Sequence, residues 1–252
     1  MEENRQVSNK KYDCLLFDLD ETLYPLGSGL SVEVIRNIQE YMIEKLGIEE
    51  SKVPELCFQL YKYYGTTKAG LRAIGYNFDY DDFHSFVQGR LPYNFLKPDP
   101  LLRNLLLSLP IRKVIFTNAD KTHAARVLNR LGIFDINDYK RHPDLELPKT
   151  PIVRKPFEEA YEQVFKIANI NPQKTFFFDD SVRNLQTGKR MGLHTVLVGT
   201  SHKAEGVDYA LESIHNIREA LPELWESSDE KSESVTYSGK VAIETYVKAL
   251  SE

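Results

Sequence analysis

The 252-residue sequence contains few cysteines and no long apolar run, and both absences exclude whole classes of protein. Its two cysteines, Cys14 and Cys57, cannot form a disulfide framework, and no CxxC pair or Cys/His cluster indicates a zinc site. No run of about 18 consecutive apolar residues is present, so a transmembrane helix is excluded. Residues 1–11 are polar and lack the apolar core of a secretory signal. We therefore expect a soluble, cytoplasmic protein.

An excess of positive charge is also absent. The 32 Lys and Arg residues are outnumbered by 37 Asp and Glu residues, which gives a formal net charge of −5. Such a chain has no general attraction to nucleic acid or to an anionic membrane, so we expect neither as a partner. Nothing in the composition indicates an oligomeric state. With 42% apolar residues, the chain is long enough to bury a substantial core.

Four short apolar runs predict buried parallel strands, because they do not alternate between apolar and polar residues. They lie at 14–17, 113–116, 175–178 and 195–198. Helical spacing, capping residues and glycine stops predict helices at about 31–46, 53–64, 66–74, 81–88, 99–107, 120–131 and 156–168, and another that ends near Gly192.

This order of elements indicates an α/β protein: a Rossmann-like, doubly wound parallel sheet with a helical insertion after the first strand. We assign the core to residues 12–25 and 97–225, the inserted helical domain to 26–96, and flexible termini to 1–11 and 226–252. The serine-rich, charged stretch 227–234 is typical of a disordered tail.

Polar side chains follow three of the predicted strands at their carboxyl ends, which lie side by side at the ligand-binding crevice of a parallel sheet. Several carboxylates gathered there would repel one another unless a cation lay among them. A ligand set of oxygens without thiolates favours Mg²⁺. The residues are Asp18 and Asp20 after the first strand, Thr117 and Asn118 after the second, and Asp179 and Asp180 after the third.

These residue types can carry out phosphoryl transfer. Asp18 and Asp20 are two apart in extended chain, so one carboxylate can attack while the other handles a proton. Thr117 and Asn118 precede a predicted helix, where hydroxyl and backbone N–H groups can hold a phosphate. Lys155, just before another predicted helix, can add a positive charge. Each motif alone also fits a helix cap, a turn or a solvated lysine, but their order and common placement favour an active site.

At these residues the chain resembles the haloacid dehalogenase superfamily of aspartate-nucleophile phosphatases. The sequence DLDET at 18–22, TN at 117–118, Lys155 and FDDS at 178–181 resemble its four motifs, over about residues 12–225. The insertion at 26–96 resembles its C1 type of cap.

The resemblance implies a role for each motif residue. Asp18 would be the nucleophile that becomes an aspartyl-phosphate, and Asp20 the general acid and base. Dehalogenating members lack the second aspartate of the first motif, so Asp20 favours phosphate chemistry. Mg²⁺ would bind Asp18, the backbone carbonyl of Asp20 and Asp180, with Asp179 beside them.

Three further stretches, at 63–76, 89–100 and 116–124, look like the pyrimidine 5′-nucleotidase-like subfamily. They look most like its plant set, which includes a xanthosine monophosphate phosphatase. This resemblance implies a nucleoside 5′-monophosphate as substrate, with the base left open between pyrimidine and xanthine.

A site that holds only phosphate and Mg²⁺ cannot distinguish one phosphomonoester from another. We therefore expect residues of the predicted cap to recognise the rest of the substrate. An aromatic ring can stack on a base, and hydroxyls and cations can bind its carbonyl oxygens or the ribose. The candidates are Tyr64, Thr67, Lys68 and Arg72, which surround Gly65 and Gly70, followed by Arg90, Tyr93 and Phe95. The alternative is that these residues form the interior and the solvated face of the cap.

One segment departs from the family. Residues 134–154 are rich in proline and charge where members usually have another apolar strand. Two alternatives to a nucleotidase stay open: a phosphatase of another small phosphometabolite and, because of this departure, a weakly catalytic interaction protein that works through its tail.

Overall fold

The computed structural model describes residues 11–133 and 153–226, and the backbone of 243–245. The segment 134–154 that departs from the family therefore lies largely outside the described residues. In the described part, a sheet of parallel strands has the order β5-β4-β3-β1-β2-β6. The strands are β1 (Cys14–Phe17), β2 (Arg112–Ile115), β3 (Thr175–Asp179), β4 (His194–Val198), β5 (Tyr209–Leu211) and β6 (Ile243–Thr245).

The four predicted strands are confirmed to within one residue at either end. Two edge strands, β5 and β6, are additional. Strand β6 lies in the tail that we assigned as flexible, and it pairs in parallel with β2 with Lys113 opposite Ile243. Both additional strands are only three residues long, which is too short for apolar patterning to identify a strand.

Each predicted helix has a counterpart in the structure. The helices are α1 (Leu30–Glu44), α2 (Val53–Tyr64), α3 (Thr67–Ala73), α4 (Tyr80–Val87), α5 (Pro100–Ser108), α6 (Lys121–Leu131), α8 (Glu158–Ile167), α9 (Val182–Arg190) and α10 (Ile217–Ala220). The predicted caps are present: Asp99 accepts a hydrogen bond from the Leu102 amide, and Asp120 accepts from the Thr122 and His123 amides.

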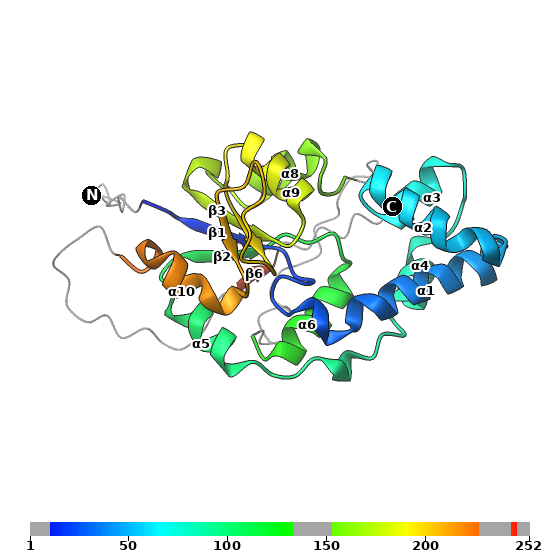
Figure 1. Ribbon diagram of the computed structural model, residues 1–252, viewed down its shortest axis with the longest axis horizontal. Helices are drawn as coiled ribbons and strands as arrows, with labels where there is room; N and C mark the ends of the chain where they lie inside the picture. Colours follow the sequence, from blue (N-terminus) through cyan, green and yellow to red (C-terminus); the bar gives the residue numbers. More distant parts are fainter. Residues whose placement is uncertain (1–10, 134–152, 227–242, 246–252) are drawn as a thin grey trace, which may run out of the picture.

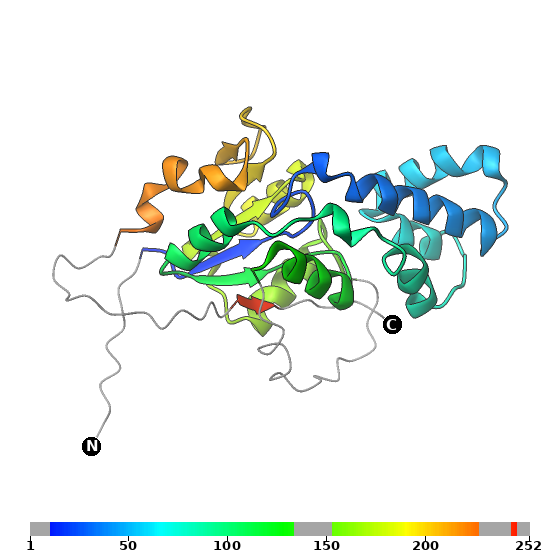
Figure 2. The same cartoon turned by 90° about the horizontal axis from the view of Figure 1, so that it is seen from below.

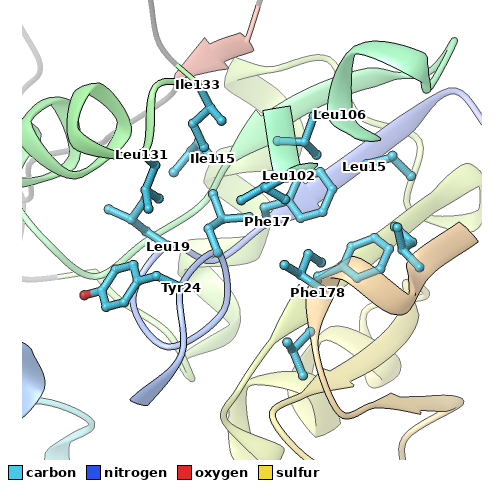
Figure 3. Close-up of a cluster of buried hydrophobic side chains, with 14 of the residues drawn as sticks. Leu15, Phe17, Leu19, Tyr24, Leu102, Leu106, Ile115, Leu131, Ile133 and Phe178 are labelled. Carbon is cyan, nitrogen blue, oxygen red and sulfur yellow. The ribbon is translucent and has the colours of Figure 1, made fainter. Parts of the chain in front are cut away.

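Both faces of the sheet are covered by helices, which explains why the central strands are apolar throughout. Alternate residues of β1 belong to two different clusters: Leu15 and Phe17 to one, Leu16 to the other. Helices α5, α6 and α10 cover the first face and α8 and α9 the second (Figure 1). Figure 3 shows the first cluster, with Phe17 and Phe178 among its side chains. The doubly wound α/β fold is confirmed.

Helices α1–α4 form a helical lobe beside the sheet (Figures 1 and 2). The lobe has an apolar cluster of its own, in which Tyr41, Leu60, Leu71, Phe83 and Val87 are buried. Its role as a substrate-reading cap stays a prediction, as do the domain boundaries. No helix in the described ranges is long and apolar enough to cross a membrane.

Candidate active site

The site lies where the chain changes direction across the sheet. From β1 the chain passes to β2 on one side, and from there it returns to β3 on the other side of β1. The carboxyl ends of β1, β2 and β3 therefore meet at the topological switch point, where ligands bind in open α/β sheets. Asp18 follows β1, Thr117 lies two residues beyond β2, and Asp179 is the last residue of β3.

A buried lysine joins two of these carboxylates. Lys155 Nζ lies 2.8 Å from Asp18 Oδ1 and 2.7 Å from Asp179 Oδ2, and the lysine is only 1% exposed. Burial alone would lower the pKa of Lys155, but the carboxylates of Asp179 and Asp18 raise it above its ordinary value. Lys155 is therefore a fixed positive charge beside Asp18.

Asn118 holds the backbone of Lys155 at this position. The Asn118 side-chain amide donates to the Lys155 carbonyl at 3.0 Å, and its oxygen accepts from the Lys155 amide at 2.9 Å. The structure thus shows the Asn118 side chain placing Lys155, and the predicted phosphate-binding role of Asn118 stays a prediction. Thr117 is buried, and its hydroxyl oxygen accepts from the Ala119 amide at 3.1 Å. Its phosphate-binding role stays a prediction.

Three carboxylates form a group able to hold a metal ion. One oxygen each from Asp18, Asp179 and Asp180 lies within 4.8 Å of the others. Burial raises the pKa of Asp18 to about 7, with Lys155 opposing the shift and the charges of Asp179 and Asp20 adding to it. Burial and the charges of Asp179 and Asp18 raise the pKa of Asp180 to about 9. Upward pKa shifts of this kind arise where buried carboxylates repel one another, and a bound cation would reduce that repulsion. An all-oxygen donor set of this kind fits Mg²⁺.

Asn184 in α9 supports this group and was not identified from the sequence. Its side-chain nitrogen donates to both oxygens of Asp179, at 2.9 and 3.1 Å. It lies one helical turn beyond the FDDS motif, and no pattern distinguishes it from an ordinary helical asparagine.

Asp20 points to a different set of partners from Asp18. Its Oδ1 accepts from the Tyr24 hydroxyl at 2.5 Å and lies 2.8 Å from His123 Nε2. Burial raises the pKa of Asp20, but the charge and hydrogen bond of His123 and the bond from Tyr24 bring it below its ordinary value. Burial lowers the pKa of His123, and Asp20 raises it above its ordinary value. The two carboxylates two residues apart thus have different partners, and their pKa values shift in opposite directions, upward at Asp18 and downward at Asp20.

The four predicted substrate-binding residues of the helical lobe occupy different places. Thr67 is buried, and its hydroxyl donates to the Cys57 carbonyl at 3.2 Å inside the lobe. Arg72 is exposed and bonds the Asn77 side chain. The carbonyl of Tyr64 accepts from Arg154 Nε at 2.5 Å. The substrate-binding role of all four stays a prediction, but Thr67 and Arg72 are engaged within the lobe.

Lys68 takes part in a side-chain bridge from the lobe to the core. Its Nζ lies 2.8 Å from His84 Nε2 in α4, and His84 Nδ1 lies 3.5 Å from Asp120 Oδ2. Burial lowers the pKa of Lys68 to about 8, with Asp120 opposing the shift and Arg154 adding to it. Lys68 is thus a partly buried cation at the junction of lobe and core.

The turn between α2 and α3 also contacts the core. Gly65 has a φ of +77°, and a Cβ there would lie 2.9 Å from Pro156 Cδ and 3.0 Å from the Lys155 carbonyl oxygen. Arg183 in α9 donates to the Lys62 carbonyl at 2.5 Å. The carboxyl end of α2 therefore meets the core next to Lys155, through backbone carbonyls and two arginines.

The sequence matches a known family and curated proteins. A family model described as haloacid dehalogenase-like hydrolase matches residues 12–192. Among curated proteins, Phosphate metabolism protein 8 of Saccharomyces cerevisiae is 27% identical over 208 residues, covering 79% of this chain and 64% of the yeast protein. The chain thus spans less than two thirds of the length of that relative.

Solved structures share the fold. CbbY from Rhodobacter sphaeroides in complex with phosphate matches with a TM-score of 0.56 and 16% identity, over 84% of this chain and 99% of that one. A HAD phosphatase from Thermococcus onnurineus matches with a TM-score of 0.51 and 14% identity, over 82% of this chain and 96% of that one.

Proposed function

Since the chain belongs to the haloacid dehalogenase-like hydrolase family, we propose that it is a Mg²⁺-dependent phosphomonoesterase that hydrolyses a nucleoside 5′-monophosphate. The observation that carries the proposal is a pair of carboxylates two residues apart with separate partners: Asp18 beside the buried Lys155 ammonium, and Asp20 beside His123 and Tyr24. The name of the yeast relative also points to phosphate metabolism.

The residues divide the reaction into two steps. Asp18 attacks the phosphorus and forms an aspartyl-phosphate, while Asp20 in its protonated form gives its proton to the leaving oxygen. Asp20 then takes a proton from water, which attacks the phosphorus and releases phosphate from Asp18. Lys155 neutralises charge on the phosphoryl oxygens, and such electrostatic stabilisation is the largest contribution in most sites of this kind.

Asp18, Asp179 and Asp180 would hold Mg²⁺, together with the backbone carbonyl of Asp20 that the family resemblance implies. When bound, the ion supplies positive charge against the phosphoryl oxygens. Without the ion, three carboxyl groups have oxygens within 4.8 Å of one another. Their mutual repulsion is then reduced only by bound protons and by the charge of Lys155.

Binding of Mg²⁺ should therefore release protons. Asp18 and Asp180 have pKa values raised to about 7 and about 9, so they are partly protonated at neutral pH. Raising the pH removes these protons, and Mg²⁺ should bind up to about tenfold more tightly per pH unit for each proton released. Calorimetric titration at pH 6, 7 and 8, in buffers of different ionisation enthalpy, measures both quantities. The same apparent enthalpy in every buffer would contradict the prediction, and Asp180→Asn should release fewer protons.

A phosphate-release assay tests the proposed function. The panel contains pyrimidine nucleoside 5′-monophosphates, xanthosine monophosphate, other nucleotides and sugar phosphates, each with Mg²⁺ and with EDTA. We expect Mg²⁺-dependent release from one nucleotide group, with EDTA abolishing it. Preference for a sugar phosphate would contradict the proposed substrate class but not the proposed phosphomonoesterase mechanism. A folded, Mg²⁺-binding protein that releases phosphate from nothing would favour an interaction protein.

We expect Lys68 to bind the nucleotide, because it is a partly buried cation at the junction of lobe and core. A hydrogen bond that involves a charge contributes about 1.5–3 kcal/mol, so Lys68→Met should raise the KM for the preferred nucleotide by roughly 10- to 100-fold. Because its pKa is about 8, the wild-type KM should rise as the pH passes 8, and the variant should lack that rise. The KM for p-nitrophenyl phosphate should stay unchanged. Lys52→Met, an exposed lysine of the same lobe, is the control; an unchanged nucleotide KM in Lys68→Met removes Lys68 from substrate binding.

A further inference from the structure

A chain of hydrogen bonds runs from Asp20 into the interior of the protein. His123 is 2% exposed and lies in the first turn of α6, where Asp120 caps the helix and accepts from the His123 amide. One ring nitrogen, Nε2, faces Asp20 Oδ1 at 2.8 Å, and the other, Nδ1, faces the Tyr93 hydroxyl at 2.9 Å. The family motifs assign no role to this histidine.

The far end of this chain lies in the segment that returns from the helical lobe to the core. Tyr93 begins a short 3-10 helix at Tyr93–Phe95, between α4 and α5, and its hydroxyl donates to the Gln88 carbonyl at 3.1 Å. Tyr93 is itself buried in the apolar cluster on the α5 and α6 face of the sheet. His123 is therefore held at its amide, at Nδ1 and by burial, and is rigidly placed toward Asp20.

Both partners of Asp20 bond the same carboxylate oxygen. The Tyr24 hydroxyl and His123 Nε2 both meet Oδ1, and the Asp20 side chain is 33% exposed. Two bonds on one oxygen restrict the rotation of the carboxyl group. None of the hydrogen bonds between Asp20 and other described residues uses Oδ2, so we infer that this oxygen meets the leaving oxygen or the attacking water.

We propose that His123 is a positioning residue for the acid/base Asp20, held in place from the lobe-to-core segment by Tyr93. The inference rests on the proposed role of Asp20 in phosphomonoester hydrolysis. His123 contacts no reacting atom; it orients the carboxyl group that does. Correct orientation matters because a general acid or base contributes about 10²- to 10⁴-fold to a rate only when it lies within hydrogen-bond reach of its proton.

The leaving group separates positioning of Asp20 from a general loss of structure. A nucleoside is a poor leaving group and needs a proton, whereas p-nitrophenolate leaves without one. His123→Ala should therefore lower kcat for the nucleotide about 10- to 100-fold, with KM changed less than about twofold. With p-nitrophenyl phosphate the first turnover should stay fast and the later ones become slow, because water attack on the aspartyl-phosphate still needs Asp20. Rapid-mixing absorbance should record a burst of one p-nitrophenolate per protein.

Three further variants complete the test. His123→Gln can still donate to Asp20, so its kcat should lie within about threefold of the wild-type value. Tyr93→Phe should lower the nucleotide kcat several-fold and show the same burst with p-nitrophenyl phosphate as His123→Ala. His215→Ala, which removes a histidine–aspartate contact to Asp99 of the same 2.8 Å length outside the site, is the control and should be unchanged. If His123→Ala does not fold, the Gln and Phe variants carry the test.

The outcomes are distinct. An active wild type together with unchanged nucleotide kcat in His123→Ala and Tyr93→Phe overturns the positioning role alone. Equal losses on both substrates, without a burst, also overturn it, because they indicate a structural defect. A wild type that releases phosphate and p-nitrophenolate from no substrate overturns the proposed function and this role with it.

Discussion

Asp18→Asn should leave the protein folded and abolish turnover. An amide cannot form the aspartyl-phosphate, and loss of a covalent nucleophile lowers kcat by about 10⁴- to 10⁶-fold in enzymes where it has been removed. Asparagine keeps the size of the side chain and an oxygen that can accept a hydrogen bond from Lys155 Nζ, which lies 2.8 Å from Asp18 Oδ1 in the wild type. Phosphate release from the preferred substrate and the melting temperature are the two measurements.

A matched control lies at the opposite end of the same strand. Asp13 immediately precedes β1 and is exposed, so Asp13→Asn removes the same charge without touching the site. It should retain full activity. If Asp18→Asn keeps more than about a hundredth of the wild-type rate, Asp18 is not the nucleophile.

Lys155→Met should damage both stability and activity. Lys155 Nζ is the cation shared by the buried carboxylates of Asp18 and Asp179. Removal of one partner from a buried ion pair destabilises proteins by about 3–5 kcal/mol, and we expect a loss of that order in metal-free buffer. The rate of phosphate release should fall at least about 10³-fold, since the charge that balances the phosphoryl oxygens is lost.

The stability loss should depend on pH in a defined direction. Burial raises the pKa of Asp18 and Lys155 lowers it, so the variant carries a still higher pKa at Asp18. A carboxyl whose pKa is raised in the folded state binds more protons folded than unfolded, and stability then falls as the pH rises. The difference in free energy of unfolding between wild type and variant should therefore grow from pH 5 to pH 8. Urea denaturation at both pH values measures it, with the exposed Lys203→Met as control; a constant difference would contradict this account.

The fold could be predicted because its signals are local. The runs at 14–17 and 175–178 are apolar on both faces, which is typical of central parallel strands, and the helix caps at Asp99 and Asp120 are local hydrogen bonds. The carboxylates at the strand ends were predictable for the same reason, since parallel strands bring their carboxyl ends together. Edge strand β6 was not predictable, because its pairing with β2 depends on a contact between distant parts of the chain.

The supporting residues of the site could not be predicted, because they act through side-chain geometry. The side chain of Asn118 holds the Lys155 backbone, a role that the sequence did not indicate, while its phosphate-binding role stays a prediction. Asn184, His123 and Tyr24 bond the motif carboxylates from α9, from α6 and from the turn after β1. Nothing in their spacing separates them from ordinary polar residues. Only the packing of the elements brings them to Asp179 and Asp20.

The apolar cluster of the lobe and the core cluster on the α5 and α6 face are both contacted by the partly buried Val34, and this arrangement bears on how the lobe can move. The chain crosses between lobe and core near Leu30 and near Leu91. Both residues are buried in the core cluster, so both connections are held against the core by apolar packing. The far side of the lobe, at the turn around Gly65, meets the core through carbonyls bonded by Arg154 and Arg183. Water can replace such polar contacts at little free-energy cost, whereas separating an apolar interface would be far more costly. We therefore expect any opening of the lobe to separate the polar contacts at the Gly65 turn, while Leu30 and Leu91 stay buried in the core cluster.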